Sequence, residues 1–435
     1  MTERFRWALG LAILGVLLAS APSAAAASGW SRPFKVAAPV PLDVVPAQIA
    51  FSAAGAAAVG YGVQDEDNPA DSIARVVQRR ARSRFGAARQ VAGEQQILSL
   101  AYGNSGLELL GGASEAGHSC CSQVHAIGPA RGSSFGPART LFSALAGATD
   151  TRLLKVSNRL LAVAATERGV WVAQSAAGGA RFAAAHRLSA PNQLPQSLDA
   201  IAGPGAQSIV AWTARTDQVT SSGPRGIYLA TGSASHAPNR RRLALTVPAG
   251  HSIDEVALAQ GAAQPTLAWI ESWFDRRGAY HAQVKLADVA GRLRPQGVSA
   301  GGELAAGLAF AADAGGDQAL TWKACDANGD CATRVVLRRA KGRFGSVQHP
   351  GAIDASQNPV AAVTLGGRAL VGWIHNGHVF AAGSQTTRLS RPSVVSPTGF
   401  GADLTIAASP RGGGLAVWTQ GTLAQSVIGA NFGGR

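Results

Sequence analysis

One stretch of the sequence gathers the residue types that most often bind ligands at protein surfaces. In Glu271-Ser-Trp-Phe-Asp-Arg-Arg277, two aromatic residues lie between carboxylates and a pair of arginines. Aromatic rings beside arginine are typical of binding hot spots, and a flat ring also stacks on the face of a sugar. The residues predicted to form this ligand-binding site are Trp273, Phe274, Arg276, Arg277, Glu271 and Asp275. The competing interpretation is that Trp273 folds down and caps its own structural unit.

The sequence offers little for catalysis. Glu271 with Asp275, or Glu271 with Asp65 and Asp67, would supply the paired carboxylates that glycoside hydrolysis needs. A zinc-binding His-Glu-x-x-His pattern and a phosphate-binding Gly-Lys-Ser/Thr loop do not occur. We therefore expect binding without chemistry and assign no catalytic residue. The alternative is a glycoside hydrolase or a polysaccharide lyase on the same scaffold.

Three stretches carry residues that ligate metals, but none completes a motif. They are the acidic loop with Asp65, Glu66, Asp67 and Asp71, the alternation of Asp326, Asn328 and Asp330, and the pair His375 and His378. The acidic loop matches no calcium spacing, and the second stretch lacks the distal glutamate of an EF-hand loop. The two histidines flank an Asn-Gly hairpin turn and supply fewer ligands than zinc requires. We therefore expect no metal and no cofactor, with Ca²⁺ as the alternative.

The four cysteines predict two disulfides, because an exported chain meets oxidising conditions. Cys325 and Cys331 bracket the polar tip of a hairpin, and a bond between them would clamp its strand ends. Cys120 and Cys121 are adjacent and are predicted to form a vicinal disulfide. Free thiols, or a metal held together with His118, are the alternatives for this second pair.

A repeated unit has to position these candidate sites, and it is clearest in residues 305–349. Short apolar runs follow one another there between Gly- or Asp-rich turns, at Gly307–Ala311, Gln318–Lys323, Thr333–Arg338 and Arg343–Gln348. Such runs predict β-strands and exclude a helical repeat. The pattern recurs about eight times at intervals of roughly 44 to 56 residues, the spacing of blades in a β-propeller.

A tryptophan recurs at one place in the second strand of the unit. The residues at this place are Trp212, Trp269, Trp322, Trp373 and Trp418, with Tyr61 in the first unit. A large ring that recurs beside Val and Ala is predicted to be core, packed between neighbouring blades. An aromatic platform for sugars is the alternative.

The two ends of the chain predict how the ring closes. The last unit, residues 401–435, has three strands and lacks the fourth, while residues 29–36 look like a lone fourth strand. Pairing them would close the ring and remove exposed sheet edges. The predicted fold is therefore an all-β propeller of eight four-stranded blades. Seven blades remain possible if residues 151–196 are irregular, and a β-sandwich pair is the alternative fold.

On this pattern the chain resembles secreted bacterial β-propeller proteins with degenerate blade repeats. The resemblance covers nearly all of the mature chain and rests on the four-strand repeat rather than on a sharp motif. The chain is similar to the sialidase superfamily in architecture only, because the Asp-box Ser-x-Asp-x-Gly-x-Thr-Trp is absent. The resemblance implies a propeller scaffold and no sialidase active site.

The N-terminus predicts export. Arg4 and Arg6 precede the apolar run Trp7–Ala19, which is short for a membrane span, and small residues follow. We expect a signal peptide over residues 1–27 and a single β-propeller domain over residues 28–435. The mature protein is expected to be a secreted or surface-associated monomer with no transmembrane segment. Retention of the signal as an N-terminal anchor is the alternative.

The net charge of +14 at pH 7 favours anionic partners, such as cell-wall polymers or acidic polysaccharides. No nucleic-acid motif is present, so nucleic acid is not an expected partner. Basic residues gather in the predicted turns between third and fourth strands: Arg79, Arg80, Arg82 and Arg84; Arg240, Arg241 and Arg242; and Arg338, Arg339 and Lys341. They form either an anion-facing rim or a solvated edge that discourages sheet pairing.

The long polar inserts fall mostly between the second and third strands of each unit, so they emerge on one face of the predicted ring. Loops held by a rigid scaffold are where binding residues concentrate. We therefore predict a scaffold that binds an extracellular polysaccharide, a cell-wall polymer or a surface protein through this face.

Overall fold

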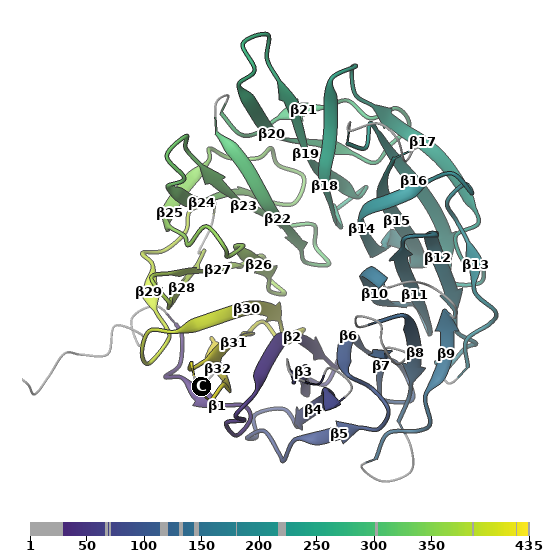
Figure 1. Cartoon of the computed structure of the whole chain (residues 1–435), viewed down its shortest axis with the longest axis vertical. Coiled ribbons are helices and arrows are strands. Elements are labelled where there is room, and N and C mark those ends of the chain that lie inside the picture. Colours follow the sequence, from purple (N-terminus) through teal and green to yellow (C-terminus); the bar gives the residue numbers. More distant parts are fainter. Residues whose placement is uncertain are drawn as a thin grey trace, which may run out of the picture.

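The strands form a ring of eight four-stranded antiparallel sheets around a central opening (Figure 1). The computed structural model describes residues 29–433, except residues 66–67, 69–70, 114–120, 130–133, 143–147, 180, 216–222, 301–302, 385–386 and 423. The predicted β-propeller with eight blades is confirmed, and the alternatives of seven blades or a sandwich are excluded. Across the described ranges, no helix has the length and apolar character needed to cross a bilayer.

The blades are numbered in chain order, and each contains four consecutive strands except the last. Blades 1 to 4 comprise β2 (Asp43–Phe51), β3 (Ala57–Gln64), β4 (Ile73–Arg79) and β5 (Arg89–Val91); β6 (Gln96–Tyr102), β7 (Leu107–Ala113), β8 (Gln123–Ile127) and β9 (Arg139–Phe142); β10 (Ala148–Val156), β11 (Arg159–Thr166), β12 (Gly169–Gln174) and β13 (His186–Arg187); and β14 (Leu194–Gly203), β15 (Gln207–Arg215), β16 (Gly226–Ser233) and β17 (Arg240–Thr246). A 3₁₀ turn, η3 (Pro204–Ala206), joins β14 to β15.

Blades 5 to 8 repeat the arrangement. They comprise β18 (His251–Ala259), β19 (Thr266–Phe274), β20 (Tyr280–Asp288) and β21 (Gln296–Gly297); β22 (Leu304–Ala312), β23 (Gln318–Cys325), β24 (Cys331–Arg338) and β25 (Gln348–Ala352); β26 (Val360–Val363), β27 (Ala369–His375), β28 (His378–Gly383) and β29 (Ser393–Val394); and β30 (Gly401–Ala408), β31 (Gly414–Gln420), β32 (Ser426–Phe432) and β1 (Phe34–Lys35). In each blade the first strand lies at the central opening (Figure 1).

The recurring tryptophans form the core, as the sequence predicts. All five, together with Tyr61, are essentially inaccessible to solvent. Each ring packs among residues of two neighbouring blades: Trp212 lies with Val163 and Val172 of blade 3, and Trp269 lies with Ile209 and Leu229 of blade 4. Successive side chains of a β-strand point to opposite faces of the sheet, so each blade buries one set of side chains on each of its two faces. Each blade therefore obtains its core from its neighbours.

Polar side chains join the inner strands of successive blades. Each inner strand is the edge of its sheet, so the amide groups that face away from the second strand lack sheet partners. The carboxylate of Asp199 in blade 4 accepts the N–H of Leu258 in blade 5 at 2.7 Å. Glu255 in blade 5 accepts the N–H groups of Gly307 and Leu308 in blade 6 at 2.9 and 2.7 Å. These bonds satisfy buried amides that would otherwise destabilise the ring.

The chain start closes the ring, as predicted. Phe34 and Lys35 of β1 pair with Gly429 and Ile428 of β32, which completes the eighth sheet. Beside them, Trp30 is 2% exposed and meets Phe432 edge-on, with 5.2 Å between the ring centroids. The closure therefore combines a short strand with a buried aromatic anchor.

Replacing this anchor tests the closure. The substitution Trp30→Ala is expected to lower the free energy of unfolding by about 3–5 kcal/mol, because a buried ring is lost and a cavity remains. Urea denaturation of a chain that comprises residues 28–435 measures the change. The matched control is Phe274→Ala, whose ring is 68% exposed and whose loss is expected to change stability by less than about 0.5 kcal/mol. A loss below about 1 kcal/mol for Trp30→Ala would show that closure does not depend on this ring.

Candidate functional site

The predicted binding residues lie at the tip of the β19–β20 hairpin of blade 5, where the second and third strands meet. The register places Trp273 opposite both His251 of β18 and His281 of β20, and Phe274 opposite Tyr280. Side chains opposite each other in antiparallel strands share a face, and consecutive residues alternate between faces. Trp273 and Phe274 therefore belong to two different clusters on opposite sides of the hairpin.

The first cluster is an aromatic stack. The Trp273 ring lies between the imidazoles of His251 and His281, with centroid distances of 5.1 and 5.4 Å and interplanar angles of 11° and 19°. Both faces of the indole are therefore covered, and the side chain is only partly accessible. A covered ring cannot stack on a sugar, so Trp273 supports the hairpin rather than presenting a platform.

Carboxylates hold both imidazoles of this stack. His251 Nδ1 donates to Glu271 Oε1 at 2.7 Å, and Lys285 Nζ donates to the second oxygen, Oε2, at 2.8 Å. His281 Nε2 donates to Asp275 Oδ2 at 3.1 Å. Glu271 is 4% exposed, so a ligand cannot reach it from solution. A buried carboxylate with a partner on each oxygen is a structural anchor, and its removal would leave the Lys285 ammonium without its ion-pair partner.

The second cluster faces solvent. Phe274 is 68% exposed and Tyr280 is 41% exposed, and their ring centroids are 5.3 Å apart at an angle of 58°. The Tyr280 hydroxyl donates to Asp254 Oδ2 at 3.2 Å, and the Ser252 hydroxyl donates to Asp254 Oδ1 at 3.0 Å. Partial burial raises the pKa of Tyr280, so the phenol remains a hydrogen-bond donor at neutral pH. The two rings form an exposed aromatic surface, in which the hydrogen bond to Asp254 holds the Tyr280 ring in place.

The turn beside these rings presents two free cations. Asp275 Oδ1 accepts the N–H groups of Arg277 and Ala279 at 2.8 and 2.9 Å, and Gly278 takes the left-handed conformation at φ +80°. This arrangement fixes the turn, because a short carboxylate side chain replaces backbone acceptors. Arg276 and Arg277 are exposed, and neither has an ion-pair partner within the described part of the chain.

Hydrogen bonds lower the pKa of Asp275. The largest contribution is the bond from His281, followed by the bonds from the Ala279 and Arg277 amides. A carboxylate that accepts several hydrogen bonds is stabilised in its ionised form. The turn therefore keeps its charged anchor down to a lower pH than an ordinary aspartate would allow.

The disulfide prediction is confirmed for the first pair. Cys325 and Cys331 are bonded, with an S–S distance of 2.00 Å and a Cα–Cα distance of 4.0 Å, and they face each other across the β23–β24 hairpin. Within it, Asp326 Oδ1 accepts the N–H groups of Asn328 and Asp330, the same turn that Asp275 makes in blade 5. Cys121 is disulfide-bonded. Its predicted partner Cys120 lies outside the described residues, as does His118.

The stretches weighed as alternative metal sites are only partly covered by the described residues. Across the described residues, no group of three or more His, Cys, Asp or Glu side chains is placed to hold a metal. Asp65 accepts the N–H of Asn68 at 3.1 Å, whereas Glu66 and Asp67 lie outside the described residues. His375 and His378 face each other across their turn, as predicted.

Charged groups at the central opening were not found from the sequence. Arg152 Nε donates to Asp199 Oδ1 at 2.9 Å, and Asp150 Oδ2 accepts the N–H of Leu198 at 3.3 Å. Desolvation raises the pKa of Asp150, partly offset by Arg152, while Asp199 and Glu255 raise it further. Carboxylates gathered at the opening resemble a catalytic arrangement, but these are engaged by amides and by Arg152. Hydrogen bonds between neighbouring blades therefore explain why these carboxylates lie at the opening.

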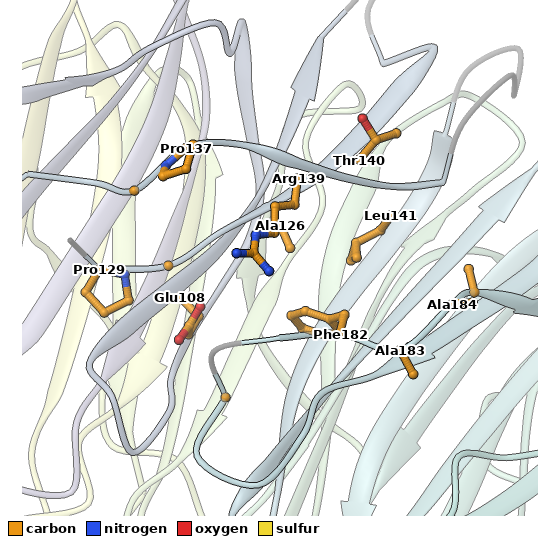
Figure 2. Close-up of a pocket in the computed structure, with 14 residues that line it drawn as sticks. Glu108, Ala126, Pro129, Pro137, Arg139, Thr140, Leu141, Phe182, Ala183 and Ala184 are labelled. Atoms are coloured by element: carbon orange, nitrogen blue, oxygen red, sulfur yellow. The ribbon is translucent and has the colours of Figure 1, made fainter.

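A pocket between blades 2 and 3 also escaped the sequence analysis (Figure 2). It holds about 320 Å³, and the side chains of Glu108, Arg139 and Phe182 gather in it. Burial raises the pKa of Glu108, and a bond from the Ser105 hydroxyl at 2.7 Å partly offsets the shift. Gly128 borders this carboxyl so closely that a Cβ there would lie 2.7 Å from Glu108 Oε2. No repeat pattern signals this pocket, because it depends on contact between two blades.

Comparison with known proteins supports the fold. No family model and no curated protein sequence matches the chain. Among solved structures, the chain is similar to the Dos1 propeller, with a TM-score of 0.57 and 10% identity over 92% of this chain and 95% of that one. Weaker similarities are to an α-L-arabinanase of Penicillium chrysogenum complexed with arabinobiose (TM-score 0.43, 9% identity, 92% and 98% covered) and to the Hadza microbial sialidase (TM-score 0.40, 11% identity, 84% and 82% covered). The similarity to the Dos1 propeller identifies the architecture as a β-propeller.

The titration of Asp275 tests the geometry of the hairpin. In the wild type, its pKa is expected below that of an ordinary aspartate, so the stabilisation that it gives is complete near neutral pH and is lost as the pH falls through the lowered value. The substitution His281→Phe keeps a ring beside Trp273 but removes the principal donor, so the pKa should rise toward the ordinary value. Carboxyl ¹³C NMR measures it, with Asp326 as the reference turn. An unchanged Asp275 pKa in His281→Phe would refute the assigned bond.

Proposed function

We propose that this chain is a secreted β-propeller that binds an extracellular polysaccharide, a cell-wall polymer or a surface protein through the blade 5 hairpin. The observation that carries the proposal is the exposed pair Phe274–Tyr280 beside Arg276 and Arg277. Large exposed aromatic side chains next to arginines are typical of binding hot spots, and an exposed ring presents the apolar face that stacks on a sugar.

The support beneath the pair favours binding. The His–Trp–His stack and the Glu271–Lys285 ion pair fix the two strands, and Asp275 fixes the turn. A surface that is already ordered loses little conformational entropy when a ligand binds. Tyr280 is further held by Asp254, so one of the two rings has a fixed orientation before a ligand arrives.

The position of Glu271 argues for binding without chemistry on this hairpin. A hydrolase of the expected kind needs one carboxyl that donates a proton and a second that acts as base or nucleophile. Both oxygens of Glu271 are bonded, to His251 and to Lys285. Asp275 accepts bonds from His281 and from two amides, and its lowered pKa makes it a poor proton donor.

The disulfide supports export. Cys325–Cys331 closes a short hairpin, and such bonds persist in oxidising compartments outside the cytosol. The sequence of residues 1–27 has the charge and hydropathy pattern of a signal peptide. Together these features favour a protein that works outside the cell or at its surface.

Co-sedimentation with cell-wall preparations and insoluble polysaccharides, with released sugars assayed in the same tubes, tests the proposal. The double substitution Phe274→Ala/Tyr280→Ala is expected to weaken binding about tenfold or more, because the contact surface is lost while the supporting stack remains. Replacing Arg276 and Arg277 by Gln should weaken binding to anionic polymers selectively.

The control is Phe400→Ala, whose ring is equally exposed at 68% and lies in the connection between β29 of blade 7 and β30 of blade 8. It should leave binding unchanged. Equal loss in both variants would place the ligand elsewhere on the ring. Released sugar that persists in the Glu271→Gln variant would point to a catalytic site outside this hairpin.

A further inference from the structure

A basic turn occurs twice in the ring with nearly the same sequence. Residues 79–86 read Arg-Arg-Ala-Arg-Ser-Arg-Phe-Gly, and residues 338–345 read Arg-Arg-Ala-Lys-Gly-Arg-Phe-Gly. Both join the third and fourth strands of their blades, on the face opposite the blade 5 hairpin. Arg82 and Lys341, at the same place in the two turns, share a φ of 62°. The two turns are therefore the same structural element, in blades 1 and 6.

Each turn holds its first arginine over its own phenylalanine. The guanidinium carbon of Arg79 lies 4.9 Å from the Phe85 ring centroid, and that of Arg338 lies 4.9 Å from the Phe344 centroid. Such a cation–π contact fixes the orientation of the guanidinium. A planar fork of donors that is fixed in advance is suited to bidentate recognition of a carboxylate, sulfate or phosphate group.

In blade 1 this arginine faces a pocket without a counter-charge. The pocket holds about 300 Å³ between blades 1 and 8, and its charged lining residues are Arg79, Arg82 and Arg411, with no carboxylate among the described residues. Arg79 Nη2 donates to the side-chain amide oxygen of Asn431 at 2.7 Å, whereas its Nε is buried and has no partner among the described residues. Burial lowers the pKa of Arg79. A desolvated cation that has neither an anion nor a full set of acceptors is costly.

The blade 6 turn borders a larger groove. The groove holds about 760 Å³ between blades 5 and 6, and its lining includes Arg292, Arg294, Arg338 and Arg343. Its one carboxylate among the described residues, Asp288, lies 3.4 Å from Arg338 Nη1, while Thr266 accepts from Arg338 Nη2 at 2.8 Å. Arg292, Arg294 and Arg343 are exposed and have no ion-pair partner in the described chain. The groove therefore retains unneutralised positive charge.

We propose that these two arginine-lined hollows bind the carboxylate or sulfate groups of an acidic polysaccharide. The proposal concerns the face opposite the blade 5 hairpin and does not depend on the function proposed for that hairpin. In each hollow one guanidinium is fixed by its phenylalanine, and a neighbouring blade supplies further arginines: Arg411 in one and Arg292 with Arg294 in the other. An anionic group would supply the counter-charge that Arg79 lacks among the described residues.

The geometry favours a polysaccharide over other polyanions. Single-stranded nucleic acid is bound by stacking bases on open aromatic faces, but a guanidinium covers one face of both Phe85 and Phe344. A membrane presents a broad surface that meets protruding cations, whereas Arg79 and Arg338 lie within hollows. A flexible chain with spaced charged groups enters such hollows and places one group in each.

Binding of the mature full chain to defined polymers tests the proposal. The probes are heparin and polygalacturonate, with uncharged dextran, duplex DNA and anionic phosphatidylserine vesicles for comparison. The variants are Arg82→Gln/Arg411→Gln for the first hollow and Arg292→Gln/Arg343→Gln for the second. The control is Arg388→Gln/Arg391→Gln, which removes two exposed arginines from the corresponding connection of blade 7, outside both hollows. In the two hollow variants, glutamine replaces each arginine by a neutral side chain of similar length. Thermal melts verify that every variant is folded.

We expect heparin or polygalacturonate to bind, each hollow variant to weaken that binding about tenfold, and the control to weaken it less than about twofold. Binding should fall with salt. If the control variant weakens polysaccharide binding as much as the hollow variants do, the loss reflects net charge alone, and the proposal of two sites is overturned. Failure of both acidic polysaccharides to bind, or tighter binding of DNA or vesicles, would overturn the ligand class.

Discussion

The burial of each blade against its neighbours is the interaction on which the whole structure depends. A four-stranded sheet has two faces, and the tryptophan of its second strand is buried only when the preceding blade covers it. Trp212 and Trp269 illustrate this, since each packs with residues of the preceding blade. A ring satisfies the requirement for every blade at once, which explains why the chain start returns to complete blade 8 through β1 and Trp30.

The same constraint explains the charges at the central opening. The inner strands converge there without pairing as one sheet, so their edge amides need other acceptors. Asp199 and Glu255 supply them across blade boundaries, and Arg152 balances Asp199. Carboxylates in this place stabilise the ring, and for that reason their presence is not by itself a sign of catalysis.

With the ring fixed in this way, the two faces are free to differ. On one face, a hairpin of blade 5 extends beyond the core and carries exposed aromatic rings on a supported framework, with Trp273 and Glu271 beneath them. On the other face, the turns of blades 1 and 6 place arginines beside neighbouring blades, where hollows form. The aromatic surface and the cationic surface therefore lie on opposite faces, and the rigid ring separates them.

Local patterns along the chain predict the strands and their order. Alternating apolar residues set the strands, the recurring tryptophan marked the core face, and the three-strand last unit with a lone strand at residues 29–36 predicted the closure. Cys325 and Cys331 were paired from spacing, because a hairpin brings its own strand ends together. These features are local or repeat at a fixed period, so they can be read along the chain.

The accessibility of these residues and the contacts that they make follow from the folded ring and not from local patterns. The sequence grouped Glu271, Trp273 and Phe274 as one site, but strand alternation separates the two rings, and residues from β18 and β20 cover Trp273 and hold Glu271. Tyr280 joins the exposed surface through cross-strand register. The arginine hollows and the Glu108 pocket form where two blades meet. Strand register and the contacts between blades depend on side chains that are distant in sequence. The periodicity of one strand does not indicate which residues of other strands lie beside it.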